Sequence, residues 1–332
     1  MIRLLSHRWL VLSAWLISMT ILAEDGLRGA AFSSPDQRLP MEDGWLQQPI
    51  VHDEKIEGAD LVVNLDQSTG PWLSPIIERF AAEQNVKIHI VSGTCGTTNR
   101  MFIKKLIDVG SLCCPPGDED RMPGVEFITL GITPIAIIAH PDNPIDDLPL
   151  SRVRELFMGE IPRWSELPEA EGTGFDKPVR PHAFLHCKRR PGHWRLLLDN
   201  EELFSTDLVA ELGIPEMISG VASSPMAIGY DMLWLATERY SDRGLVKVLT
   251  VDGVDPADLD ALAQGKYTLY RTLNLVVWND GKARKPLAEA LLRYAVAEAE
   301  RDGARYSILP AGRLRKAGWR FREDELIGEP GS

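Results

Sequence analysis

The chain has little positive charge. Its 332 residues hold 36 lysines and arginines against 48 aspartates and glutamates, which gives a formal net charge of −12. Nucleic-acid binding depends on clustered basic side chains that neutralise phosphates. The run Lys188-Arg189-Arg190 is an exception, and a short basic run is more typical of a solvated or anion-facing loop. We therefore expect no nucleic acid as a partner.

Long apolar runs are also absent beyond the N-terminus. Arg3 and Arg8 precede the uncharged apolar stretch Trp9–Leu22, which is short for a membrane span but typical of a secretory signal. We predict a signal peptide over residues 1–23 and a periplasmic protein; a retained N-terminal membrane anchor is the alternative. No cysteine suited to lipid attachment follows the signal, so any tether would come from partners or an uncleaved signal.

Familiar catalytic motifs are missing as well. The sequence has no Gly-x-Ser-x-Gly elbow, no P-loop and no His-Glu-x-x-His helix. Cys187 and His193 could pair as nucleophile and base, but no orienting acid accompanies them. We therefore expect neither an enzyme nor a resident cofactor.

What the chain does contain is an alternation of strand and helix patterns with glycine turns between them. Residues 24–57 show no sustained periodicity and are predicted to be an extended lead-in. From Gly58 on, apolar runs alternate with amphipathic stretches, which predicts an α/β fold. The predicted strands are 61–65, 86–91, 125–130, 133–139, 179–185, 227–230, 246–250 and 268–277, and the predicted helices are 71–84, 98–107, 152–158, 193–203 and 285–300.

Three segments in this order resemble motifs of the phosphate-binding periplasmic proteins of ABC importers. They are Leu156–Trp164, which is similar to "IFxGxIxxW", Ser224–Tyr230, similar to "PxAIGY", and Gly265–Arg271, similar to "GxYPLxR". The resemblance covers Gly58 to Arg320. It implies a two-lobed type II binding-protein fold with mixed sheets flanked by helices, and a ligand held between the lobes.

The resemblance also implies how the chain divides between the lobes. Two crossovers are expected near residues 132–137 and 268–275. Lobe 1 would then combine residues 58–134 with 268–332, and lobe 2 would comprise residues 135–267.

The family's ligand loops map onto four segments of this chain. In the first, Ser68 and Thr69 keep the expected hydroxyl and amide character. In the second, Thr94 keeps a hydroxyl, but Cys95 stands where a serine is usual. The resemblance thus implies that Ser68, Thr69 and Thr94 supply hydrogen bonds to the ligand.

The other two loops depart further from the family. Cys113 stands at the carboxylate that ends the family's "DxGxSD" motif, Cys187 at an arginine, and Pro191-Gly192-His193 at "SGT". All four cysteines of the chain lie in the second, third and fourth of these loops, and helix N-termini there would favour thiolates. We therefore predict a site for a thiophilic metal or metalloid, arsenite above all, with zinc or copper as other candidates. Cys95, Cys113, Cys187 and His193 would be its ligands.

Several alternatives remain open at this stage. An even number of cysteines in an exported chain is typical of disulfides, which would leave a binder of phosphate or a related oxyanion. His193 could cap a helix, and Cys114 could point away from the cleft or pair elsewhere. The protein would deliver its ligand to an ABC permease or signal to a membrane sensor kinase; it could also be a kinase partner that binds no ligand. Some proteins of this general fold are arsenite sensors of that kind.

Overall fold

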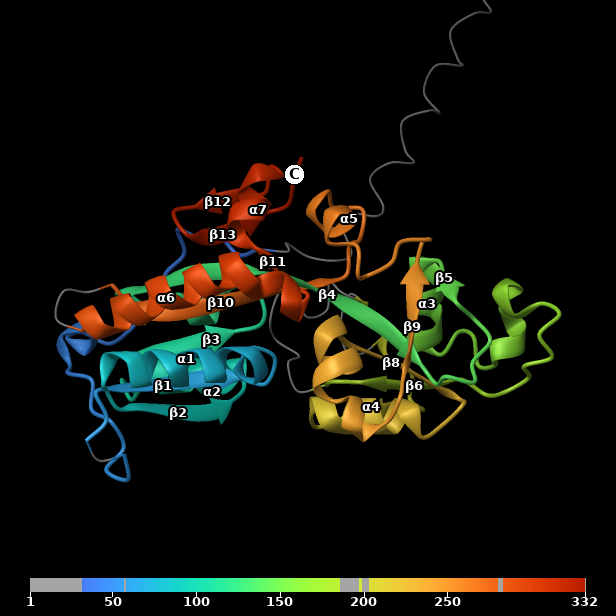
Figure 1. The fold of residues 1–332 in the computed structure, drawn as a ribbon, viewed down its shortest axis with the longest axis horizontal. Helices are drawn as coiled ribbons and strands as arrows, with labels where there is room; N and C mark the ends of the chain where they lie inside the picture. The colour runs from blue at the N-terminus through green and yellow to red at the C-terminus, as the bar shows by residue number, and fades with distance from the viewer. Residues whose placement is uncertain (1–31, 57, 186–196, 199–202, 280–282, 332) are drawn as a thin grey trace, which may run out of the picture.

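The computed structural model describes residues 32–56, 58–185, 197–198, 203–279 and 283–331. Two groups of strands and helices lie side by side and are joined by a long strand, β4 (Figure 1). The predicted signal peptide, and the predicted helix 193–203 apart from a few residues, lie outside the described residues. In the described part, no helix is long and apolar enough to cross a membrane.

The first group contains three parallel strands and two further strands in antiparallel pairings. Strand β1 (Leu61–Asp66) pairs in parallel with β2 (Ile88–Gly93) and β3 (Val109–Leu112). Strand β10 (Tyr270–Trp278) runs antiparallel to β3 and to β4 (Val125–Ala139). The loops after β1, β2 and β3 therefore open at one edge of the sheet.

The second group is built on the far end of β4. There β4 pairs antiparallel with β8 (Ala227–Met232) and β9 (Lys247–Val251). Strand β8 pairs with β6 (Arg180–Ala183), which pairs with the short β7 (Val209–Ala210). The remaining short strands are β5 (Asp147–Leu148) beside β9, β11 (Leu309–Pro310) beside β4, and the hairpin of β12 (Arg320–Arg322) and β13 (Glu325–Gly328).

Strand β4 passes from one group to the other without a break. Residues Val125–Pro134 face β10, and residues Ile135–Ala139 face β8. The prediction of two strands, 125–130 and 133–139, was wrong because Gly131 is not a turn residue here. A Cβ atom on Gly131 would lie 2.4 Å from the carbonyl oxygen of Leu309. The glycine thus permits the close approach of β11 to a continuous strand.

The helices cover the two groups of strands. On the first, α1 (Gly70–Gln84) and α6 (Pro286–Asp302) lie beside each other on one face (Figure 1). Trp72, Ile76, Ile77 and Phe80 form the buried side of α1, as its apolar periodicity predicts. The other helices are α2 (Cys95–Ile103), α3 (Leu150–Met158), α4 (Ile214–Ala222), α5 (Leu259–Ala263) and α7 (Ala311–Lys316).

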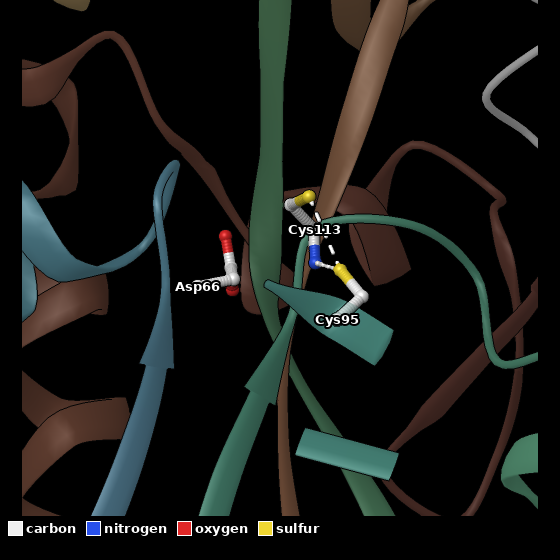
Figure 2. Close-up of side chains that lie close together, drawn as sticks. All are labelled: Asp66, Cys95 and Cys113. Carbon is white, nitrogen blue, oxygen red and sulfur yellow. Dashed lines mark hydrogen bonds between the residues drawn. The ribbon is translucent and has the colours of Figure 1, made fainter. Parts of the chain in front are cut away.

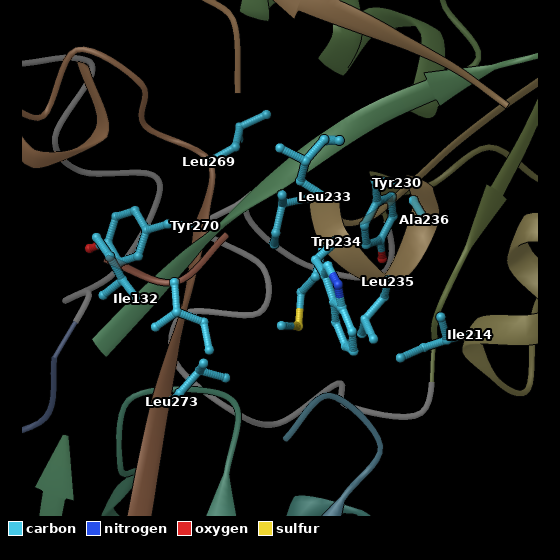
Figure 3. Packing of buried hydrophobic residues seen from close by; sticks show 14 of the residues in the cluster. Ile132, Ile214, Tyr230, Leu233, Trp234, Leu235, Ala236, Leu269, Tyr270 and Leu273 are labelled. Carbon is cyan, nitrogen blue, oxygen red and sulfur yellow. The ribbon is translucent and has the colours of Figure 1, made fainter. Parts of the chain in front are cut away.

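A continuous apolar core follows β4 across the molecule. Figure 3 shows Ile132, Leu269 and Leu273 near one part of β4, and Tyr230 with residues 233–236 near another. All of these side chains are buried, and they belong to one cluster. The mixed α/β architecture with helices flanking the sheet is the predicted one.

The described part of the lead-in, residues 32–56, packs against the first group of strands. Trp45 is buried, and its indole Nε1 donates a 2.8 Å hydrogen bond to the carbonyl of Ile103. The ammonium of Lys105 lies 4.6 Å from the ring of Trp45 and 4.5 Å from that of Trp278. These contacts are cation–π interactions, so the extended lead-in is part of the folded protein.

Candidate functional site

A small cavity lies where the loops after β1, β2 and β3 face strand β8 and helix α4. Its volume is about 30 Å³. That is enough for a water-sized or small inorganic ligand but far below the space that a drug-sized organic molecule needs. The lining residues are Asp66, Gln67, Ser68, Thr94, Cys95, Cys113, Phe184, Ile214, Asp231 and Arg271.

Three helices begin at this cavity. Ser68 lies just before α1, Thr94 is the N-cap of α2, and Ile214 is the first residue of α4. The Thr94 hydroxyl accepts a 3.3 Å hydrogen bond from the backbone N–H of Thr97. This cap explains why α2 begins at Cys95 and not at Thr98 as predicted. Helix N-termini carry partial positive charge, so their convergence favours negative charge in the cavity.

Asp66 organises the first loop from the end of β1. Its Oδ1 accepts hydrogen bonds from the backbone N–H groups of Ser68 at 2.9 Å and Thr69 at 3.1 Å. Its Oδ2 accepts a 2.5 Å hydrogen bond from the hydroxyl of Ser111. These bonds hold the loop against β3 and bring Ser68 to the cavity, while Thr69 is buried behind it.

Two cysteine sulfurs lie in contact beside Asp66. The Sγ atoms of Cys95 and Cys113 are 3.4 Å apart, and the backbone N–H of Cys113 donates to Cys95 Sγ at 3.3 Å (Figure 2). One carboxylate oxygen of Asp66 and these two sulfurs all lie within 4.8 Å of one another. The three residues come from the ends of β1 and β3 and the start of α2, and so from three of the loops that border the cavity.

Arg271 and a third cysteine, Cys114, lie next to Cys113. The Nη1 atom of Arg271 lies 3.9 Å from the Sγ atoms of both Cys113 and Cys114. Cys114 is itself buried, and Asn274 Nδ2 donates to its carbonyl at 3.0 Å. Cys95, Cys113 and Cys114 are all thiols in this structure, without a disulfide among them.

The three thiols differ in pKa because their surroundings differ. Hydrogen bonds from the Cys114 and Cys95 thiols, helped by the positive charge of Arg271, hold the pKa of Cys113 well below its usual range. Their hydrogen bonds with Cys113, together with burial, raise the pKa of Cys95 and of Cys114. The arrangement therefore favours one thiolate, on Cys113, beside two neutral thiols.

Two carboxyl groups at the cavity have raised pKa values. Burial, with a contribution from the charge of Cys113, raises the pKa of Asp66 to about 7. Burial also raises the pKa of Asp231 to about 7, against the opposing effect of Arg271. The backbone N–H of Met232 donates to Asp231 Oδ1 at 2.7 Å, and Oδ2 is buried without a hydrogen-bond partner in the described residues. Such a buried acceptor is expected to meet a ligand or water.

The predicted site residues fall into three groups. Ser68, Thr94, Cys95 and Cys113 line the cavity, and Thr69 lies buried next to it. Cys187 and His193 lie outside the described residues, so their predicted role as ligands stays a prediction. The described cavity residues bring together the first three predicted loops.

Sequence reasoning missed three charged members of the cavity lining: Asp66, Asp231 and Arg271. Each had a detectable signal. Asp66 begins the first ligand loop, Asp231 directly follows the Ser224–Tyr230 motif, and Arg271 ends the Gly265 motif. Cys114 was expected to point away from the cleft or to pair elsewhere, and it lies outside the cavity lining, where the turn after β3 places it against Cys113 and Arg271.

Comparison with known proteins agrees with this fold. The model of the PBP superfamily domain matches residues 55–299. A structure described as a phosphate ABC transporter substrate-binding protein with bound phosphate, from Clostridium perfringens, matches with a TM-score of 0.65 and 19% identity, over 76% of this chain and 99% of that one. An ABC-type phosphate transport receptor from Vibrio cholerae matches with a TM-score of 0.58 and 14% identity, over 76% and 100%.

No protein among the curated sequences matches this chain. Because the family model covers most of it, the chain belongs to the periplasmic-binding-protein (PBP) superfamily. The resemblance found in the Leu156, Ser224 and Gly265 motifs is thereby confirmed at the level of the family. At identities below a fifth, the two solved structures show the shared fold.

Proposed function

We propose that this protein is an exported solute-binding protein that captures a small inorganic oxyanion, phosphate or a relative of similar size, and delivers it to an ABC permease. Both compared structures are named for phosphate transport, and one contains phosphate. This was the alternative to the thiophilic ligand in the sequence analysis. The comparisons favour it over the arsenite reading.

The observation that carries the proposal is the convergence of positive groups on one small cavity. The N-termini of α1, α2 and α4 face it, and the guanidinium of Arg271 lines it. The hydroxyls of Ser68 and Thr94 add hydrogen-bond donors. Together these groups can replace the hydration shell of a small anion, and the cavity of about 30 Å³ limits the ligand's size.

The acidic groups in the cavity set a condition on the anion. With Asp66, Asp231 and Cys113 all ionised, their charges would exceed that of Arg271 and repel an anion. The two carboxyls have pKa values of about 7, so below that pH each can donate a hydrogen bond to an oxyanion oxygen. When ionised, a carboxylate can instead accept the proton of a hydrogen oxyanion. Oxyanion affinity is therefore expected to fall as the pH rises through 7.

Titration calorimetry with inorganic phosphate on the reduced protein, at pH 6 and pH 8, tests the proposal. We expect binding that is tighter at pH 6, and a loss of about 10- to 100-fold in Arg271→Gln, the size of one charge-assisted hydrogen bond. Arg163→Gln is the matched control, because Arg163 is exposed and pairs with Asp176. Ser68→Ala serves as a second variant if Arg271→Gln misfolds. Absence of phosphate binding by the wild type at millimolar concentration would contradict the proposal.

The thiol cluster favours a second candidate function, binding of a thiophilic metal or metalloid such as arsenite. Cys95 and Cys113 lie in contact at the cavity, and one carboxylate oxygen of Asp66 lies within 4.8 Å of both sulfurs. Two sulfurs beside a carboxylate suit a thiophilic metal ion or metalloid. Within the described residues, Asp66 therefore joins the predicted ligands Cys95 and Cys113. A sensor kinase as the partner has no support in the comparisons.

Arsenite titration distinguishes the two candidates. If arsenite is the cargo, it should raise the melting temperature of the reduced protein, and Cys113→Ser should abolish that shift. If phosphate is the cargo, Cys113→Ser should retain phosphate binding, because the substitution removes a negative charge from the cavity. An arsenite effect that survives in Cys113→Ser would exclude this thiol site.

A further inference from the structure

The cavity combines a pair of touching thiols with a nearby cation. The Sγ atoms of Cys95 and Cys113 are 3.4 Å apart, and Arg271 Nη1 lies 3.9 Å from Cys113 Sγ. A disulfide needs the sulfurs about 2.05 Å apart, so they would have to approach by little more than an ångström. A positive charge near one sulfur favours its thiolate, the form that attacks oxidants.

Access to the pair is restricted by size. Both cysteines line the cavity of about 30 Å³, and the exposed fraction is 1% for Cys95 and 5% for Cys113. A folded oxidoreductase or a glutathione-sized disulfide needs a sulfur that it can approach along the S–S axis, whereas a peroxide is little larger than a water molecule. The geometry thus admits small peroxides in preference to larger oxidants.

We propose that Cys113 and Cys95 form a peroxide-reactive pair in which Cys113 is the attacking sulfur and Cys95 resolves the product into a disulfide. This inference stands apart from the proposed function, because it concerns the chemistry of the protein without its cargo. It gives the cavity a second, oxidised state.

The chemistry balances as follows in two steps. The Cys113 thiolate attacks one oxygen of hydrogen peroxide, the O–O bond breaks, and Cys113 becomes a sulfenic acid. The departing hydroxide takes a proton from the solvent and leaves as water. The Cys95 thiol then attacks the sulfenic sulfur and releases a second water. In sum, two thiols are oxidised by two electrons and one peroxide is reduced to two waters.

Cys95 is the resolving residue in preference to Cys114. Cys113 and Cys114 are adjacent in sequence, and the required Cβ directions strain a disulfide between neighbours. Cys95 comes from a different element, the start of α2, and its sulfur already contacts Cys113. Cys95 also lines the cavity, whereas Cys114 lies outside its lining.

Oxidation would change the binding properties of the cavity in opposite directions for the two candidate cargoes. The disulfide removes the thiolate beside Arg271, so oxyanion affinity should be retained or increased. It also removes two soft donors, so a thiophilic cargo should no longer bind. Peroxide could therefore select between the two kinds of ligand at one site.

The test is peroxide titration of the exported protein in a Cys187→Ser background, followed by alkylation under denaturing conditions and peptide mapping by mass spectrometry. We expect one equivalent of peroxide to link Cys95 to Cys113, in the Cys114→Ser variant as well. In Cys113→Ser, thiol loss should be at least tenfold slower. In Cys95→Ser, a sulfenic acid on Cys113 should be trapped by dimedone.

Two results would overturn the proposal. One is a link that joins Cys95 to Cys114, or persists in Cys113→Ser, since Cys113 would then not be the attacking sulfur. The other is the survival of all three thiols under peroxide that oxidises a free cysteine added to the same tube. If a further variant does not fold, mapping in the Cys187→Ser background still shows which two cysteines are linked and whether the three thiols survive. Because no cargo is present, these outcomes are independent of phosphate or arsenite binding.

Discussion

At the scale of single residues, the site is defined by how burial and neighbouring charges alter ordinary side chains. Asp66 and Asp231 are ordinary carboxyls whose pKa values rise to about 7 because the cavity excludes water from them. The pKa of Cys113 is lowered instead, because hydrogen bonds from the Cys114 and Cys95 thiols and the charge of Arg271 stabilise its thiolate. The same small volume thus contains two acids that are neutral in mildly acidic solution and one thiolate.

Asp231 should make the protein less stable as the pH rises. The unfolded carboxyl ionises near pH 3.9, and the folded one near 7. Below pH 4 both states are protonated and Asp231 costs nothing. Between pH 4 and 7 the unfolded chain loses the proton first, so the free energy of unfolding falls, by up to about 4 kcal/mol in all. Asp231→Asn should remove this fall, as measured by urea denaturation at pH 4.5, 6 and 8.

Asp176→Asn is the control for this experiment. Asp176 is exposed, and hydrogen bonds from Arg163 and Ser165 lower its pKa. The stability of that variant should follow the wild-type curve above pH 4.5. If Asp231→Asn shows the same pH slope as the wild type, the carboxyl is ionised throughout and the assignment of its raised pKa is wrong.

At the scale of elements, strand β4 and its neighbours hold the two groups of strands in one molecule. Its first ten residues pair with β10 and its last five with β8. Strand β11 lies against β4 at Gly131, where there is no room for a side chain. Asp66, Cys95 and Cys113 therefore face Asp231, the residue of β8 that lines the cavity, across that cavity.

Gly131→Ala should test this close approach. The added Cβ would lie 2.4 Å from a backbone oxygen, so β11 must move away from β4. We expect a loss of about 1–3 kcal/mol in unfolding free energy, the usual cost of overpacking. Gly70→Ala is the control, since a Cβ there meets only Leu65 Cβ at 3.6 Å, an ordinary contact. Equal stability of the two variants would show that β11 yields without cost.

At the scale of the whole molecule, the described lead-in belongs to the fold. Residues 32–56 add the buried Trp45, whose ring contacts Trp278 near the end of β10 and the ammonium of Lys105. The Ser33 hydroxyl also donates to the carbonyl of Pro116 at 2.6 Å. The described lead-in packs against the first group of strands. It contributes no residue to the cavity lining.

Trp45→Ala should therefore reduce stability without changing ligand affinity. Loss of the buried ring and of its hydrogen bond to Ile103 is expected to cost about 3–5 kcal/mol, as for other buried tryptophans. Val51→Ala, at an exposed position of the same segment, should change stability by less than about 0.5 kcal/mol. Urea denaturation measures the stability, and titration calorimetry with inorganic phosphate measures the ligand affinity. A weakened affinity in Trp45→Ala would mean that the lead-in is coupled to the cavity.

The sequence by itself determined the local elements and the family. Apolar periodicity placed α1, α6 and most strands within a few residues, because burial of one face dictates those patterns. Motif order indicated the binding-protein fold, and the predicted loops supplied Ser68, Thr94, Cys95 and Cys113 to the cavity. These features depend on residues close together in the chain.

Only the tertiary structure decided which distant residues meet. Arg271 and Asp231 come from strands far along the chain, and nothing local shows that they face Cys113. The contact of Cys114 with the other thiols follows from the turn after β3, and the unbroken course of β4 follows from its pairing with β10 and β8. Acidity follows burial and neighbouring charge, which are properties of the folded chain, so the chemistry of the cavity could not be read from its residues alone.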